Sequence, residues 1–258
     1  MKKIKTLIIL ALLILIGSVN SNAQDTALLQ VIHNAADPGA ASVDIYVNDL
    51  LFLDDFAFRT ATAFSEVPAD VNLTIGVAGP DSIGPEDIIA EFDILLGANE
   101  TYVAIANGVL DPTIFAENPD GANISFTLFT RGRIKTECML PNRVKLLAFH
   151  GATDAPGVDI MVTNHWGIRS KLFNNLDYGK FSRYKTLLEG SYILEVTPEK
   201  DNNTVVVTFD ADLSSLGGGT AVVFASGFLD PSNNQDGEAF GLFAALPDGQ
   251  VVELPILP

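Results

Sequence analysis

Two sets of histidine and aspartate residues recur along the chain with nearly the same spacing, and they are the polar residues best suited to chemistry. The sets are His33, Asp37 and Asp44, and His150, Asp154 and Asp159. A histidine with two carboxylates can bind a metal ion or transfer protons. The alternative is structural, because Asp-Ala-Pro-Gly is a turn sequence in which the aspartate bonds the backbone and the histidine bonds a turn carbonyl. We favour the structural role, since both copies carry the set.

Acidic residues in turn-rich loops form a second candidate site, for Ca²⁺. This ion takes six to eight oxygen ligands, which carboxylates and backbone carbonyls supply. None of the loops has the Asp-x-Asp-x-Asp-Gly spacing of an EF-hand, so we favour solvated turns over a metal site. No other cofactor is expected. The candidate ligands are Asp111, Asp120, Asp230 and Asp236.

The single tryptophan, Trp166, lies between His165 and Arg169 in a short polar stretch. An exposed indole there would suit stacking on a sugar ring. Burial of the indole in a hydrophobic core is the equally weighted alternative.

No catalytic signature occurs in the chain. It has no Gly-x-Ser-x-Gly elbow, no His-Glu-x-x-His and no Cys and His spacing typical of zinc. We therefore name no catalytic residue and expect a protein that is not an enzyme.

These residues must be positioned by a duplicated domain. Comparison of the chain with itself gives matching blocks in one order, at offsets of about 114 to 121 residues, as expected for a repeat whose loops vary in length. The clearest block aligns residues 107–112, Asn-Gly-Val-Leu-Asp-Pro, with residues 226–231, Ser-Gly-Phe-Leu-Asp-Pro.

The duplication predicts the domain boundaries. The first repeat occupies residues 27–133 and the second occupies residues 144–256, and residues 134–143 form a linker. Cys138 lies in this linker and is the only cysteine, so it cannot form an internal disulfide. A free thiol and an intermolecular bridge both remain open.

Alternation of apolar and polar residues predicts β-strands within each repeat. In residues 42–47, Val43 and Ile45 should face a core, whereas Asp44 and Tyr46 should face solvent. Gly-, Pro- and Asn-rich turns separate such runs at short intervals. The expected fold is all-β, with two tandem immunoglobulin-like or transthyretin-like β-sandwiches of about seven strands each.

The opening of each repeat resembles the domain-of-unknown-function family numbered 4397. The resemblance rests on residues 33–47 and 150–160, which follow that family's pattern of His, small residues, Asp-Ala-Pro and Val-Asp-Val-Tyr. It implies a bacterial protein of the secreted or cell-surface kind, often with tandem domains. It implies no settled activity.

The first 23 residues predict a cleaved signal peptide. Three lysines precede an apolar run over residues 7–16, and Ser-Asn-Ala at residues 21–23 is a suitable cleavage site. No cysteine lies near that site, so the mature protein should not be a lipoprotein. We expect a periplasmic, cell-surface or extracellular protein without a membrane span after cleavage.

Charge narrows the partners. The chain has 15 basic and 32 acidic residues; without the three signal lysines the balance is 12 − 32 = −20. Such a surface repels nucleic acid, which binds clustered Lys and Arg. The sequence thus predicts an exported, non-enzymatic interaction or adhesion module that binds an unknown protein or glycan at the cell envelope. The alternative is a carbohydrate-binding or polysaccharide-processing accessory protein.

Overall fold

The structure, a computed structural model, describes residues 24–258. Within that range the chain forms 17 strands and four short 3₁₀ helices, and the strands lie in four sheets. The prediction of an all-β chain with two tandem sandwiches is confirmed. The predicted signal peptide, residues 1–23, lies outside the described residues.

The first repeat has eight strands rather than the seven expected. Its inner sheet 1 has the strand order β4-β1-β7-β8, with β1 and β7 parallel, and its outer sheet 1 has the order β3-β2-β5-β6. The elements are β1 (Thr26–His33), η1 (Pro38–Ala40), β2 (Ser42–Val47), β3 (Leu50–Ala57), β4 (Ser65–Pro68), β5 (Asn72–Ala78), η2 (Pro85–Asp87), β6 (Ile88–Leu95), β7 (Thr101–Asn107), η3 (Pro112–Ile114) and β8 (Thr127–Gly132).

The second repeat has the same topology and one additional strand, β17. Inner sheet 2 has the order β12-β9-β15-β16-β17, again with a parallel central pair, and outer sheet 2 has the order β11-β10-β13-β14. The elements are β9 (Arg143–His150), β10 (Val158–Asn164), β11 (Arg169–Leu176), β12 (Lys185–Leu188), β13 (Ser191–Pro198), β14 (Val207–Asp212), β15 (Thr220–Ser226), η4 (Pro231–Asn233), β16 (Gly241–Ala245) and β17 (Val251–Glu253).

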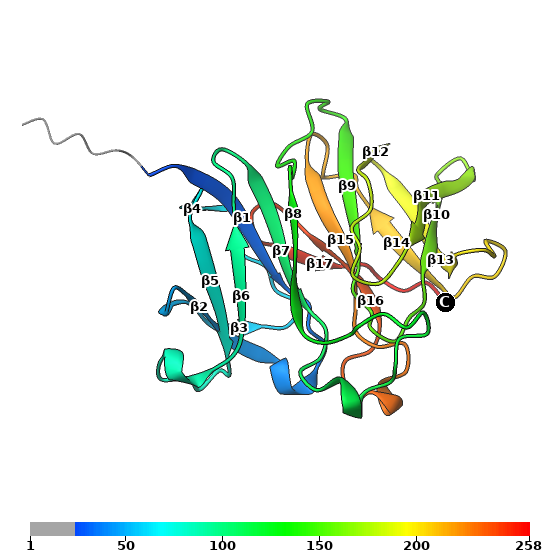
Figure 1. The fold of residues 1–258 in the computed structure, drawn as a ribbon. Coiled ribbons are helices and arrows are strands. Elements are labelled where there is room, and N and C mark those ends of the chain that lie inside the picture. Colours follow the sequence, from blue (N-terminus) through cyan, green and yellow to red (C-terminus); the bar gives the residue numbers. More distant parts are fainter. Residues whose placement is uncertain (1–23) are drawn as a thin grey trace, which may run out of the picture.

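The four sheets stack as four layers, in the order outer 1, inner 1, inner 2 and outer 2 (Figure 1). One hydrophobic core fills each sandwich. A third core fills the space between the two inner sheets, where Ile32 and Ile105 of the first repeat meet Leu147, Phe149 and Phe224 of the second. All five side chains are at most 1% exposed. The two repeats therefore share a hydrophobic core whose side chains are as buried as those within each sandwich.

Buried amides join the repeats at the end of this core. Asn34 Nδ2 donates to Asn107 Oδ1 at 2.6 Å and to the carbonyl of Ala225 at 3.0 Å. Asn107 Nδ2 donates to the carbonyl of Gly151 at 3.1 Å and to Tyr178 Oη at 3.0 Å. Gly151 occupies the position equivalent to Asn34, and a Cβ there would lie 2.2 Å from Asn34 Nδ2. Equivalent positions thus meet across the interface, as in a symmetric dimer.

The predicted linker is packed. Strand β8 ends at Gly132 and β9 begins at Arg143, and between them Ile134 joins the shared core. The backbone N–H of Cys138 donates to the carbonyl of Gly218, and its side chain is 6% exposed. The thiol is free and buried, so the intermolecular bridge considered above has no accessible sulfur.

The prediction that Asp44 and Tyr46 face solvent is wrong. Both are buried, at 1% and 3% exposed, although they lie on the outer face of outer sheet 1. The loop after β5 covers that face, and its Ser82 hydroxyl hydrogen-bonds with Asp44 Oδ2 and with Tyr46 Oη. Alternation located the strand correctly but could not reveal a covering loop.

No helix among residues 24–258 is long and apolar enough to cross a membrane.

Removing one aromatic ring from the shared core should destabilise both repeats together. Phe149→Ala deletes a buried side chain, and we expect it to lower the free energy of unfolding by about 4 kcal/mol in one cooperative transition. Phe52→Ala is the matched control, since Phe52 is 45% exposed and its loss should cost on the order of 1 kcal/mol. Urea unfolding followed by fluorescence and circular dichroism measures both. Two separate transitions, with only the second shifted, would contradict a shared core.

Candidate functional site

The signature histidines lie in the interior and bond to turn carbonyls. His33 Nε2 lies 2.8 Å from the carbonyl oxygen of Ala40, and the backbone N–H of Ala35 donates to its Nδ1 at 3.4 Å. These contacts assign the proton to Nε2. His150 makes the equivalent contact, with its Nε2 3.0 Å from the carbonyl oxygen of Pro156.

The first signature aspartates connect two loops in each repeat. Asp37 accepts from the backbone N–H groups of Gly39 and Leu110, both at 2.8 Å. Asp154 accepts from the backbone N–H of Leu229 at 2.9 Å. Leu110 and Leu229 are equivalent in the duplicated block. The carboxylate therefore fixes the loop after the first strand of the repeat to the loop after its parallel neighbour.

The second signature aspartates stabilise a bulge in the neighbouring strand. Asp44 Oδ1 accepts from the N–H of Asp55 at 2.9 Å, and Asp159 Oδ1 accepts from the N–H of Asn175 at 2.7 Å. Asp55 and Asn175 both have φ of +50°, where the strand register shifts. Asp159 also pairs with Lys171 Nζ at 2.6 Å. A carboxylate that receives the N–H of a left-handed residue satisfies a donor that the sheet leaves free.

All six signature side chains thus bond to other groups of the protein. The loops that they organise lie with η1, η3 and η4 at one end of the molecule (Figure 1).

The candidate calcium ligands are not brought together. Asp111 and Asp230 cap the short helices η3 and η4 by accepting from the backbone N–H two residues on. Asp120 accepts from the N–H of Gly157 in the other repeat at 2.7 Å. Asp236 is a turn residue with φ of +52°. Residues 24–258 contain no group of three or more His, Cys, Asp or Glu side chains arranged to hold a metal ion. The favoured interpretation as solvated turns and the Ca²⁺ alternative both stay untested predictions.

Trp166 is exposed, so of the two interpretations left open by the sequence, burial in the second core does not apply. It lies at the tip of the β10–β11 hairpin with 66% of its surface accessible, and Ile168 beside it is 61% exposed. Asn164 Oδ1 accepts from the N–H groups of both residues and fixes the turn. The His165 ring lies against the indole with centroids 3.7 Å apart. This hairpin is the feature for which the sequence left two interpretations open.

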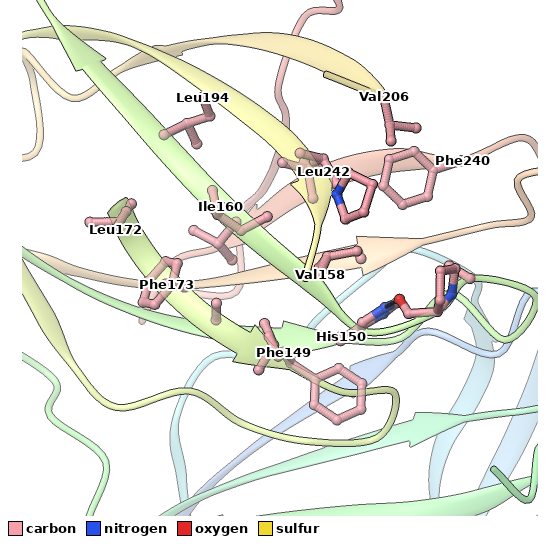
Figure 2. A pocket seen from close by; sticks show the side chains of 18 of the residues that line it. Phe149, His150, Val158, Ile160, Leu172, Phe173, Leu194, Val206, Phe240 and Leu242 are labelled. Atoms are coloured by element: carbon pink, nitrogen blue, oxygen red, sulfur yellow. Dashed lines mark hydrogen bonds between the residues drawn. The ribbon is translucent and has the colours of Figure 1, made fainter. Parts of the chain in front are cut away.

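A small apolar cavity of about 80 Å³ lies between the sheets of the second repeat. Figure 2 shows His150, Val206 and Phe240 on one side of it and Leu172, Phe173 and Leu194 on the other. A counterpart of about 160 Å³ in the first repeat is lined by His33. Sequence reasoning missed both cavities, because each depends on how residues of two sheets meet.

Burial controls the charge of the signature histidines. It lowers the pKa of His33 to about 4, against the opposing effect of the bond to Ala40. Burial also lowers the pKa of His150, and the bond to Pro156 opposes it. Both rings are therefore neutral at pH 7, which suits the hydrogen bonds described above and not a cationic acid.

Comparison with models of protein families identifies the family of this chain. The family model described as "Domain of unknown function (DUF4397)" matches it twice, over residues 27–125 and 144–236. The chain belongs to this family. A search of curated proteins gives no match. A solved streptococcal structure, titled "Alpha-glucan binding by a streptococcal virulence factor", is 8% identical with a TM-score of 0.24 and covers 76% of this chain and 92% of its own. At that TM-score the likeness says nothing of what this DUF4397 protein binds.

The buried DUF4397 histidine should make the fold sensitive to acid. Because the pKa of His33 is lowered from 6.5 to about 4 on folding, the unfolded state binds the extra proton. The neutral His33 ring therefore contributes fully to the free energy of unfolding above pH 6.5. This contribution, about 3 kcal/mol, is lost as the pH falls toward 4. We expect His33→Gln to reduce the pH dependence of urea unfolding between pH 7 and 4.5. The exposed His165→Gln is the control, and equal pH slopes in the two variants would contradict this role.

The loop connection made by Asp37 should be essential for stability. Asp37→Ala leaves two backbone N–H groups without their partner, and we expect a loss of about 3 kcal/mol in the free energy of unfolding. Asp54→Ala, an exposed carboxylate, should change it by less than about 0.5 kcal/mol. Thermal melting of both variants tests the difference; equal melting temperatures would rule out a structural role for the carboxylate.

Proposed function

We propose that this chain is an exported, non-enzymatic interaction module that binds a partner at the cell envelope. The observation that carries the proposal is the use of the shared polar residues. All six signature side chains hydrogen-bond within the protein, so the groups best suited to chemistry serve the fold. Exposed side chains of the repeats are therefore the first candidates for contact with a partner.

The β-hairpins supply that surface. Large apolar side chains held at exposed positions on an ordered turn are typical of interaction sites, and tryptophan is enriched among the residues that dominate binding energy. In the second repeat the hairpin presents Trp166 and Ile168. The equivalent hairpin of the first repeat presents Leu50 and Leu51, which are 73% and 51% exposed. Each repeat thus offers one apolar tip.

The shared core makes the two tips part of one body. Residues of both repeats pack into one buried layer, which holds the two sandwiches that carry the hairpins in one arrangement. Two contacts held at a fixed separation bind a partner with less loss of freedom than two contacts on a flexible tether.

Glycan binding is the second candidate, and the surroundings of Trp166 favour it. The indole and the His165 ring form an exposed aromatic surface. Nearby on the sheet, Arg169 bonds with Glu195 and with the carbonyl of Asn202. An aromatic surface beside ordered polar groups suits a sugar ring, which has apolar faces and hydroxyl edges.

Retention of the mature protein on cell envelopes tests both candidates. Fluorescently labelled residues 24–258 are incubated with envelope fractions of the source organism, and Trp166→Ala should weaken retention by about tenfold because a hot-spot aromatic is removed. Met139→Ala is the control, since Met139 is 81% exposed and belongs to the segment between β8 and β9, outside both hairpins.

Pretreatment of the envelopes separates the two candidates. Loss of retention after protease treatment identifies a protein partner, and loss after periodate oxidation identifies a glycan, which a glycan array would then define. No retention on untreated envelopes, or recovery of the full-length protein from the cytoplasmic fraction, would contradict the proposal.

A further inference from the structure

The second repeat has a large unfilled space at the end of its sandwich opposite the signature loops. The space is a cavity of about 590 Å³ between inner sheet 2 and outer sheet 2. Its walls include Leu146, Ala221 and Ala244 from the inner sheet and Leu194 and Ala211 from the outer sheet. Cavities of 300 to 1,000 Å³ are the usual size of small-molecule sites.

The duplication explains why the cavity exists. When the alignment of residues 107–112 with 226–231 is extended back along the strands, Tyr102 of β7 corresponds to Ala221 of β15. Tyr102 packs against the core of the first repeat, and its hydroxyl accepts from the N–H of Gly97 and donates to Glu100, both at 3.0 Å. The tyrosine therefore fills the end of the first sandwich. Alanine at the equivalent position leaves the second sandwich open.

A neighbouring exchange accompanies this one. Gly132 pairs with Tyr102 in the sheet, and a Cβ there would lie 2.8 Å from the tyrosine ring. The equivalent residue in the second repeat is Leu246, which lines the cavity. The first repeat thus pairs a large Tyr102 with Gly132, whereas the second pairs a small residue with the larger Leu246. The leucine does not fill the space.

The lining defines the chemistry of the ligand. Along β14 the residues alternate, so Phe209 and Ala211 are buried while Asp210 and Asp212 are exposed. Gln250 and Glu253 of the last hairpin also line the cavity. The lining is thus mainly aliphatic, with the carboxylates of Asp210 and Asp212 at exposed positions along its β14 edge, where they would repel an anionic ligand.

The space continues along the sandwich. Leu146, Leu194 and Val223 line both this cavity and the smaller one beside His150. An elongated ligand therefore fits the space better than a compact one.

We propose that the second repeat binds an uncharged aliphatic chain in this cavity. Cavities lined mainly by aliphatic side chains take up apolar molecules. Each methylene that enters should add about fourfold to the affinity. The site is separate from the hairpin tips.

A series of linear alcohols tests the proposal. ¹⁵N-labelled residues 24–258 are titrated with 1-hexanol, 1-octanol and 1-decanol, and NMR shifts are followed at the amides of Ala211, Ala221 and Ala244. Affinity should rise about 15-fold for every two methylenes, and hexanoate should bind more weakly than hexanol, because its charge would be buried without a partner. Shifts that are absent, or that do not depend on chain length, overturn the proposal.

Substitutions that fill the cavity provide a second test of the proposal. Ala221→Met from the inner sheet and Ala211→Val from the outer sheet should each weaken octanol binding at least tenfold, while the melting temperature is kept or raised. Ile193→Met, on the outer face of β13, and Trp166→Ala should leave octanol binding unchanged. Octanol affinity unchanged in both filled variants, each with a cooperative melt, would refute the site. Dependence on Trp166 would place the binding at the hairpin instead.

Competition between octanol and lipid vesicles shows whether the bound aliphatic chain belongs to a lipid or to a free molecule. Phosphatidylcholine vesicles that displace octanol from the cavity identify a lipid acyl chain as the ligand. Vesicles that leave octanol in place assign the cavity to free aliphatic molecules.

Discussion

The packing of one inner sheet on the other is the interaction on which the rest of the molecule depends. It requires inner strands that are apolar on both faces, because one face meets the sandwich core and the other meets the sister repeat. Strand β9 shows the result: Leu146 faces its own sandwich, and Leu147 and Phe149 face the first repeat. Either repeat alone would expose a large apolar surface. The folding unit is therefore the pair of repeats and not the single sandwich.

That packing also imposes differences between the copies. Where equivalent positions meet, two identical large side chains would compete for one space. Asn34 occupies the space that the missing side chain of Gly151 leaves, and Asn107, whose counterpart is Ser226, bonds across the interface to Gly151 and Tyr178. Arg59 and its counterpart Gly179 also differ where the repeats meet. Arg59 donates to Ser226 and Ala239 of the second repeat, whereas Gly179 lies against Phe129 of the first. A duplicated chain that packs on itself must diverge at its centre.

The sequence predicted what local chemistry controls. The β-sandwich class and the turn role assigned to Asp37 follow from patterns within a few residues, and the duplication follows from comparison of the chain with itself. The shared core, the burial of Asp44 and Tyr46 and the exposure of Trp166 do not, since each is decided by segments far apart in the chain. Burial of Asp44, for example, depends on Ser82, 38 residues away. The cavities were missed for the same reason, because a void is a property of two facing sheets.

Divergence away from the interface has a different cause. Tyr102 shows that the fold can fill the end of its sandwich, with the hydroxyl hydrogen-bonded and the ring packed. Protein interiors are close-packed, and an unfilled apolar space costs dispersion contacts that a larger side chain would restore. No contact with the sister repeat requires Ala221 to be small, since its side chain lies on the opposite face of the inner sheet from the shared core. Local departures from good packing that the fold does not need are expected where a site serves another molecule, and the space beside Ala221 is the departure from which the aliphatic site is proposed.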